Sequence, residues 1–297
     1  MKILVTGAAG MLAESLVPEL RKKGHNVLAT DINAGAGCSF LDVRNYEKFL
    51  QIASAFKPDF IFHLAAETDV DKCQIQPDYA FENNAIGTYN AALIAKKLKT
   101  KLLYVSTAGV FDGKKAEPYT ELDKPNPINI YGASKLAGEE YIKDLVDDFY
   151  IVRAGWMMGG GEKDKKFVHK ILEQIKSGAK HIYAVTDKFG TPTYAPAFSE
   201  MVTTLIETDF FGLYHIACKN KASRFDVAKE ILEILGRTDI ELHPVDSSYF
   251  NKDYFAPRPA SEVMRNYMLE LRKMDKMPTW QDALKEYLYS LHIVDRH

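Results

Sequence analysis

The sequence predicts an α/β protein of the Rossmann type, a doubly wound parallel sheet with a smaller α/β substrate-binding lobe. Three observations predict this class. Short apolar runs alternate with longer segments of helical spacing through the first half of the chain. A glycine-rich turn follows the first apolar run. Continuous apolar runs such as Phe60-Ile61-Phe62 suit strands that are covered on both faces. Together they favour parallel strands joined by right-handed crossovers.

Each predicted element of the first half is bounded by a recognisable signal. The strand Lys2–Thr6 runs directly into a glycine, and the helix Met11–Lys23 is closed by Gly24. Pro58 interrupts the chain before the strand Phe60–Leu64. The other strands and helices predicted in this half are, in order, Asn26–Thr30, Tyr46–Phe56, Asn84–Leu98, Lys101–Ser106, Tyr131–Leu145 and Tyr150–Arg153.

The regular alternation weakens beyond Gly159, where short strands and proline-rich loops separate the helices. The helices predicted in this half lie near Lys166–Ile175, Ala197–Glu207, Arg224–Leu235 and Thr279–Leu291. We therefore divide the chain into a dinucleotide-binding Rossmann domain at 1–158 and a mostly substrate-binding lobe at 159–297. Segments near 192–220 are expected to return to the first domain.

Charge and composition exclude several classes of protein. Among 297 residues, 38 Lys+Arg face 40 Asp+Glu, so the net charge of −2 gives no field for attracting nucleic acid or an anionic membrane. No uncharged apolar stretch approaches the ~20 residues that span a bilayer. The cysteines, Cys38, Cys73 and Cys218, are odd in number and far apart, which favours free thiols and neither a disulfide framework nor a metal site. We expect a cytoplasmic protein with no nucleic-acid or membrane partner.

The turn after the first strand has the pattern Gly7-x-x-Gly10-x-x-Ala13, in the place where a dinucleotide-binding fold puts its phosphate loop. One glycine permits the tight turn and the second lets the backbone approach a pyrophosphate, while a small third residue allows close packing of helix and strand. Met11 opens the helix, whose free N–H groups and positive dipole end favour phosphate. Gly7, Gly10 and Met11 are therefore predicted cofactor-binding residues.

Three further positions are predicted to meet the adenosine half of the cofactor. Asp31 ends the second strand, where a carboxylate accepts hydrogen bonds from ribose hydroxyls. A carboxylate there would repel a 2′-phosphate, so we expect NAD(H) to be favoured over NADP(H). Asp42 and Val43 follow a short third strand and are placed to touch adenine.

A second group of residues has the chemistry of a proton-transfer site. Tyr131 and Lys135 are four residues apart, so a helix puts both side chains on one face. An ammonium stabilises a phenolate and moves the phenol's pKa from about 10 toward neutral pH. Thr107, at the end of an earlier strand, has a hydroxyl that can hold a carbonyl oxygen during the proton transfer. We predict Thr107, Tyr131 and Lys135 as the catalytic residues.

On these motifs the chain resembles the extended short-chain dehydrogenase/reductases, and within them the dTDP-4-dehydrorhamnose reductase family. The resemblance runs nearly the whole length. It rests on the Gly7 loop, Ala65-Ala66, Thr68, Val70-Asp71-Lys72-Cys73, Asn84-Ala85, Ser106-Thr107, Val110-Phe111-Asp112-Gly113, Asn129-Ile130-Tyr131-Gly132, Ser134-Lys135-Leu136-Ala137-Gly138-Glu139, Arg153, Trp156, Phe167-Val168, Gly190-Thr191-Pro192-Thr193, Gly212, Tyr214-His215, Arg258-Pro259 and Arg265-Asn266-Tyr267.

The resemblance implies reduction of the 4-keto group of a nucleotide-linked 6-deoxyhexose by hydride from a nicotinamide. Tyr131 would protonate the developing alkoxide, Lys135 would lower the pKa of Tyr131 and hold the nicotinamide ribose, and Thr107 would polarise the carbonyl. Ala65 and Ala66 would line the cofactor cleft. The residues that the resemblance places at the nucleotide sugar are Thr68, Asn84, Trp156, Thr193 and Arg258.

The chain departs from this family at several positions. Ala108-Gly109 stands where the family commonly has Asp-Tyr after the threonine, which removes a carboxylate and a phenol beside the reacting sugar. Lys166 and Lys188 replace an Asn and a frequent Gln. Two other functions therefore stay open: a nucleotide-sugar epimerase with tightly bound NAD, and a non-catalytic NAD(P)-binding regulatory subunit. A homodimer is also left open.

Overall fold

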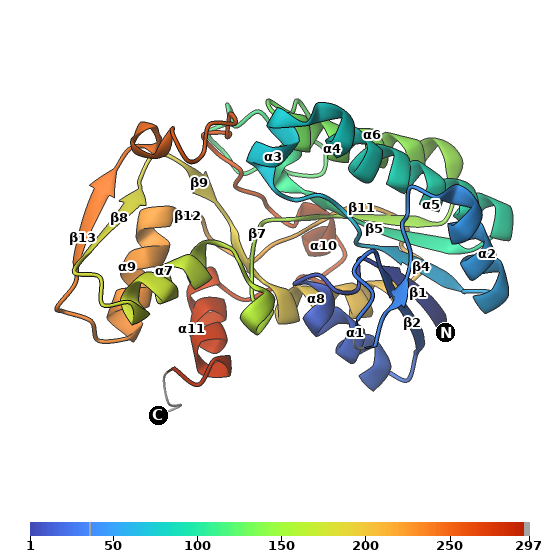
Figure 1. Cartoon of the computed structure of the whole chain (residues 1–297), viewed down its shortest axis with the longest axis horizontal. Helices are drawn as coiled ribbons and strands as arrows, with labels where there is room; N and C mark the ends of the chain where they lie inside the picture. The colour runs from blue at the N-terminus through green and yellow to red at the C-terminus, as the bar shows by residue number, and fades with distance from the viewer. Residues whose placement is uncertain (36, 294–297) are drawn as a thin grey trace.

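A seven-stranded parallel sheet organises the larger part of the computed structural model, which describes residues 1–35 and 37–293 (Figure 1). The strand order is β11-β6-β5-β4-β1-β2-β3. The strands are β1 (Lys2–Thr6), β2 (Asn26–Asp31), β3 (Ser39–Phe40), β4 (Phe60–His63), β5 (Lys101–Thr107), β6 (Phe149–Ala154) and β11 (Gly212–Ile216). The order reverses between β1 and β4, and ligands of such sheets bind at the carboxyl ends of the strands beside a reversal of this kind.

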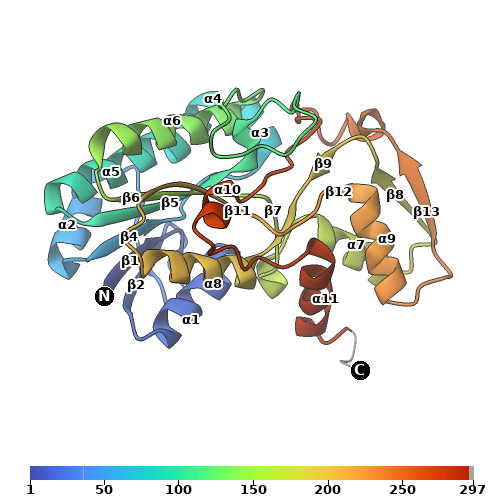
Figure 2. The ribbon, with the colours of Figure 1, turned by 180° about the vertical axis from the view of Figure 1, so that it is seen from behind.

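Helices cover both faces of this sheet (Figures 1 and 2). On one face lie α1 (Ala13–Lys22) and α8 (Ala195–Ile206), and on the other lie α2 (Tyr46–Phe56), α5 (Gly87–Leu98) and α6 (Ile130–Leu145). The apolar strands explain this arrangement, because all four residues of β4 are buried and need cover on both sides. The predicted Rossmann-type fold is confirmed.

One predicted helix has a different start in the structure. The helix expected at Asn84–Leu98 is part of a longer helical segment, in which α4 (Pro77–Phe81) leads into a π-helical turn at Glu82–Ile86 and then into α5. Turns of this kind occur at functional sites more often than elsewhere. The turn contains Asn84, whose side chain is fully buried. The short helix α3 (Val70–Ile75), between β4 and α4, was not predicted.

The second half of the chain builds a smaller lobe from pairs of short strands (Figure 1). The pairs are β8 (His181–Val185) with β13 (Glu241–Val245), β9 (Phe189–Gly190) with β12 (Ala222–Ser223), and β7 (Trp156–Met158) with β10 (Pro192–Tyr194). Its helices are α7 (Phe167–Lys176), α9 (Arg224–Ile234), α10 (Tyr267–Leu271) and α11 (Trp280–Ser290). Single 3-10 turns occur at Ala108–Val110, Gly161–Lys163 and Ser247–Phe250.

The two parts share one hydrophobic core. A single cluster of buried side chains extends from Ile3 of β1 and Phe198 of α8 to Ile231 of α9 and Leu288 of α11. β11 comes from the second half of the chain but pairs with β6 in the large sheet. The division at residue 158 therefore follows the sequence order and not a gap in the packing. Within the described part of the chain, no helix has both the length and the apolar character needed to cross a membrane.

Candidate active site

The glycine-rich turn after β1 lies where the strand order of the sheet reverses. Gly7 has a φ of 71°, and a Cβ built on it would lie 2.5 Å from the backbone nitrogen of Ala65, just beyond β4. The N–H of Gly10 donates to the carbonyl of Gly7 at 3.1 Å and closes the turn. Ala65 and Ala66 continue half-buried from β4. Position 7 therefore has no room for a side chain, and the glycine keeps the turn tight as a dinucleotide-binding turn requires.

A segment of the smaller lobe packs on this turn at Met11. A Cβ on Gly160, whose φ is 90°, would lie 2.6 Å from Cγ of Met11. Nearby, Lys163 and Glu14 form an ion pair at 2.5 Å with both side chains about half exposed. The triple glycine at 159–161 therefore lets the lobe touch the nucleotide turn, a contact that the sequence pattern did not predict.

The side chain of Asp31 holds the nucleotide turn in place by hydrogen bonds. Its two carboxylate oxygens accept backbone N–H groups from Ala9 at 3.0 Å and from Asn33 at 2.7 Å, and the residue is buried. The carboxylate is therefore part of the scaffold of the nucleotide turn in this structure.

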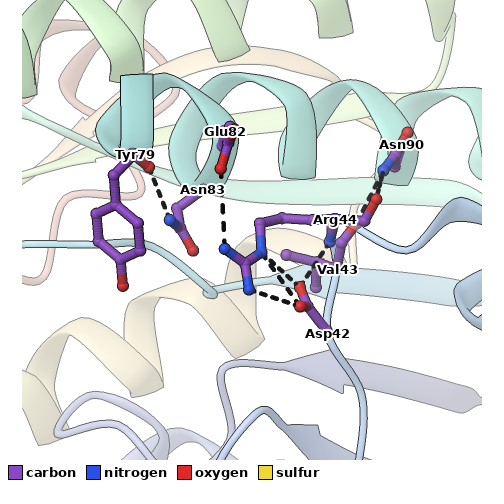
Figure 3. A network of polar contacts seen from close by, with 7 residues as sticks. All are labelled: Asp42, Val43, Arg44, Tyr79, Glu82, Asn83 and Asn90. Carbon is purple, nitrogen blue, oxygen red and sulfur yellow. Dashed lines mark hydrogen bonds and ion pairs between the residues drawn. The ribbon is translucent and has the colours of Figure 1, made fainter. Parts of the chain in front are cut away.

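Asp42 and Val43 belong to a polar network beside α5 (Figure 3). Asp42 accepts hydrogen bonds from the guanidinium of Arg44 at 2.7–3.1 Å, and these bonds lower its pKa below the usual value. Asn90 holds the segment by donating to the carbonyls of Val43 and Arg44, at 2.9 and 3.1 Å. Arg44 also lies 4.0 Å from Glu82 (Figure 3). The segment is fixed to α5, and its contact with adenine stays a prediction.

The structure brings the three predicted catalytic residues together at the carboxyl end of β5. Asn129 caps α6 by accepting the N–H of Gly132 at 2.8 Å. A Cβ on Gly132 would clash with the carbonyl oxygen of Gly109, so the first turn of α6 lies directly against the end of β5. Tyr131 consequently reaches Thr107, with which it shares a hydrogen bond, and Thr107 also accepts the N–H of Gly109 at 3.0 Å.

Burial controls the protonation of this group. It raises the pKa of Tyr131 to about 12, against the hydrogen bond with Thr107, which lowers it. It lowers the pKa of Lys135 to about 7, opposed by the charge of Glu139. The ammonium of Lys135 lies 4.1 Å from the ring centroid of Tyr104. Tyr131 is therefore a neutral phenol at neutral pH, whereas Lys135 carries its charge only in part. The phenol's pKa is raised by burial and not lowered toward neutral pH as expected.

A buried ion pair lies under the site. Arg153 of β6 donates to both carboxylate oxygens of Glu139, at 2.8 and 2.7 Å, and Ser106 donates to the same carboxylate at 2.6 Å. Arg153 and Glu139 are at most 1% exposed. An unpaired charge at this depth would be very costly, so the two side chains stay paired. The pair therefore connects the ends of β5 and β6 rigidly to α6.

Two buried histidines near the sheet have structural roles. His63 lies between the hydroxyls of Thr6 and Thr88, at 2.8 and 3.1 Å, and burial lowers its pKa to about 3. Burial likewise lowers the pKa of His215 to about 3. Both are neutral packed side chains.

Three of the predicted substrate residues differ widely in exposure. Asn84 is fully buried and donates to Ser134 and to the carbonyl of Glu67, both at 3.0 Å, so it supports α6 from behind. Thr193 is also fully buried, and its hydroxyl donates a hydrogen bond to the carbonyl of Thr191. Thr68 is exposed, and its hydroxyl lies 3.4 Å from the ammonium of Lys166. Substrate contact by these residues stays a prediction.

The other two predicted substrate residues have protein partners. The indole N–H of Trp156 donates to Glu262 at 2.7 Å. Arg258 forms an ion pair with Asp71 at 2.5 Å and donates to the carbonyl of Ala256. Arg258 thereby joins the lobe to α3, and some of its guanidinium N–H groups already have protein partners in this structure.

Sequence reasoning missed Glu262 and Arg224, which both lie beside Trp156. The guanidinium of Arg224 stacks on the Trp156 ring at 3.8 Å, and a Cβ on Gly190 would clash with the same ring. Glu262 lies near Thr107, 155 positions away in the chain. Only the nearby Arg258-Pro259 motif hinted that this segment belongs to the site.

Comparison with known proteins gives consistent matches over the whole chain. The family model described as the RmlD substrate binding domain matches residues 1–293. The spore coat polysaccharide biosynthesis protein SpsK of Bacillus subtilis is 32% identical over 97% of this chain and 96% of its own length. A dTDP-4-dehydrorhamnose reductase structure from Clostridium acetobutylicum has a TM-score of 0.91 and 36% identity, covering 98% of this chain and 100% of that one.

A further solved relative corrects the predicted cofactor. The dTDP-4-dehydrorhamnose reductase of Bacillus anthracis, in complex with NADP, has a TM-score of 0.88 and 32% identity over 97% of this chain and 99% of that one. The expected preference for NAD(H) over NADP(H) is therefore wrong. It rested on the charge of Asp31, whose carboxylate oxygens already accept the N–H groups of Ala9 and Asn33.

Proposed function

The chain belongs to the RmlD substrate binding domain family, and on that premise we propose that it is a reductase of a dTDP-linked 4-keto-6-deoxyhexose, with NADPH as the hydride donor. The observation that carries the proposal is the contact between the end of β5 and the first turn of α6. It supports a site in which Thr107, Tyr131 and Lys135 act together, since Tyr131 is brought into hydrogen-bond contact with Thr107 and Lys135 lies one turn further along α6.

The residues present fit a dinucleotide. A side chain at Gly7 would collide with the backbone of Ala65, and α1 begins at Ala13, shortly after the turn, so the backbone from Gly7 to Met11 would hold the pyrophosphate. Ala65 and Ala66 would line the opposite wall, and Lys135 would hold the nicotinamide ribose. When bound, the reduced dinucleotide supplies a hydride to the sugar carbonyl carbon.

The protein's part in the reaction is to hold the carbonyl and to provide a proton. The Oγ1 of Thr107 donates a hydrogen bond to the carbonyl oxygen at C4 of the sugar. As that oxygen gains negative charge, the Oη of Tyr131 gives it a proton, and the phenolate later regains one from solvent. The raised pKa keeps Tyr131 protonated before the reaction, and the ammonium of Lys135 stabilises the phenolate that is left.

The test is a panel of nucleotide-linked 4-keto sugars with the purified protein. We expect oxidation of NADPH with a dTDP-linked 4-keto-6-deoxyhexose and formation of the 4-hydroxy sugar. Interconversion of nucleotide sugars without net consumption of the dinucleotide would support an epimerase instead. Bound dinucleotide with no turnover on any sugar of the panel would support a non-catalytic subunit.

We further infer that the protein works in the cytoplasm. Its thiols Cys38, Cys73 and Cys218 are free, which suits a reducing compartment. The formation of a homodimer stays a prediction, which the molar mass in solution would test.

A further inference from the structure

Glu262 borders the space that a side chain on Gly109 would enter. A Cβ built on Gly109 would lie 3.3 Å from Oγ1 of Thr107 and 3.6 Å from Oε1 of Glu262. The family that the chain resembles commonly has a tyrosine at position 109. Here a carboxylate from a segment 153 positions later lies in that space.

The carboxylate of Glu262 is held in one orientation. Its Oε2 accepts the indole N–H of Trp156 at 2.7 Å, and the Trp156 ring is fixed by the guanidinium of Arg224 at 3.8 Å. Within the described chain, Oε1 has no hydrogen-bond donor and faces the side of Thr107. Burial raises the pKa of Glu262, and the indole together with Arg224 opposes this. A carboxyl oxygen accepts a hydrogen bond from a hydroxyl in either protonation state.

The chemistry of the substrate identifies the partner of Oε1. Thr107 holds the C4 oxygen in the proposed reaction. Of the two ring carbons next to C4 in a 6-deoxyhexose, C5 carries a methyl group and C3 carries a hydroxyl. The polar group nearest the reacting carbonyl is therefore the C3 hydroxyl.

We propose that Glu262 is a specificity-determining residue whose Oε1 accepts a hydrogen bond from the C3 hydroxyl of the sugar. This inference rests on the proposed function. It places the carboxylate of Glu262 next to position 109, so the chain retains a polar group beside Thr107 despite Gly109.

The test compares a 4-keto-6-deoxy sugar with its 3-deoxy analogue. On the full substrate, Glu262→Ala is expected to lower kcat/KM by ~10–100-fold, the range for a hydrogen bond to a charged group. Glu262→Gln, which keeps an acceptor, should recover most of it. On the 3-deoxy analogue, wild type and Glu262→Ala should agree within about threefold, and NADPH binding should be unchanged throughout.

Two outcomes would overturn the assignment. One is an equal loss on both sugars in Glu262→Ala, which would mean that Glu262 only supports the site. The other is a loss on the full substrate in Glu262→Gln as large as that in Glu262→Ala, because a retained acceptor would then make no difference. If the wild type itself turns over neither sugar, the proposed function fails. Calorimetric binding of dTDP-rhamnose and its 3-deoxy analogue to the same variants then decides the role of Glu262 separately.

An independent cluster on the outer edge of the smaller lobe has the composition of a transition-metal site. Nδ1 of His181 lies 3.0 Å from Nε2 of His243, and these atoms lie 3.4 and 3.6 Å from Oε2 of Glu241. Zinc at its usual distances to nitrogen and oxygen places tetrahedral ligand atoms about 3.3 Å apart. The three measured separations are close to this value.

The strands and their aromatic side chains position these ligands in advance. His181 on β8 faces Glu241 on β13 in the parallel register. Tyr183 stacks on the His243 ring at 4.8 Å, and Tyr249 stacks on Tyr183 at 5.2 Å. We infer that His181, Glu241 and His243 bind one divalent transition-metal ion such as Zn²⁺, with the fourth position open to water.

Calorimetry with Zn²⁺ tests this site in a Cys38→Ser background, which removes the half-exposed thiol. We expect one ion per chain and a loss of affinity of at least tenfold in both His181→Ala and His243→Ala. The matched control is His169→Ala, because His169 pairs with a single carboxylate, Glu173, and should leave the affinity unchanged. No saturable binding, or binding that neither variant weakens, would contradict the site.

Discussion

The nucleotide side of the site and the sugar side are built in different ways. On the nucleotide side, strand ends and adjacent turns supply the site, and Gly7, Asp31 and Ala65 lie at or just beyond the ends of strands of one sheet. On the sugar side, short strands and loops bring together Trp156 and Glu262, which lie far apart in the sequence. Under the proposed function, consecutive strand–turn–helix units of the sheet would position the cofactor, whereas single long-range contacts would position the sugar. Changes on the sugar side should alter specificity without altering the cofactor.

The largest expected effect is at the junction of the two sides. Tyr131→Phe removes the proton donor and keeps the ring that packs at the start of α6. We expect kcat to fall by ~10²–10⁴-fold, the usual contribution of a positioned acid, while NADPH binding stays near that of wild type. Steady-state kinetics and a titration of NADPH measure both. A kcat within a few-fold of wild type would remove Tyr131 from the proposed role.

The second prediction concerns a substitution that disturbs the nucleotide side alone. Gly7→Ala puts an alanine in the left-handed backbone conformation of position 7, which costs about 1–2 kcal/mol. It also places a methyl group 2.5 Å from the backbone of Ala65. We expect NADPH affinity to fall at least about tenfold, since the turn must shift. Gly35→Ala is the matched control, because a Cβ there has nothing within 4 Å. Equal affinities in the two variants would argue against the role of the turn.

The third prediction concerns pH. Lys135, with a pKa lowered to about 7 by burial, is an ammonium below that pH and loses its charge as the pH rises through it. Because the ammonium favours the phenolate left on Tyr131, kcat should decrease above neutral pH, by up to about tenfold per pH unit. The phenol, with a pKa of about 12, stays protonated throughout this range. A pH–rate profile measures the decrease, and Lys135→Met should be slower and lack it.

The smallest effect is expected on the sugar side. Arg258→Gln removes the ion pair with Asp71 that joins the lobe to α3. We expect KM for the nucleotide sugar to rise several-fold with little change in KM for NADPH. A change confined to the KM for NADPH would show that the two sides are not separable in this way.

The same contrast explains what the sequence predicted. The strands of the sheet and the pairing of Tyr131 with Lys135 follow from periodicity and spacing, which act locally. The contact of Glu262 with Trp156, the closure of Gly160 on Met11, and the stacking of Arg224 depend on how the chain returns to the sheet, and no local pattern encodes them. The cofactor preference failed for a related reason, because a charge at Asp31 does not reveal its backbone partners.

The central claim is hydride transfer to C4 of a nucleotide-linked sugar, and isotope transfer tests it most directly. NADPH deuterated at the transferred position of the nicotinamide is supplied with a dTDP-linked 4-keto-6-deoxyhexose, and the product is examined by NMR. The account predicts one deuterium at C4 of the sugar and one NADP⁺ formed for each product molecule. A product without deuterium at C4, or product formed without oxidation of NADPH, would contradict it.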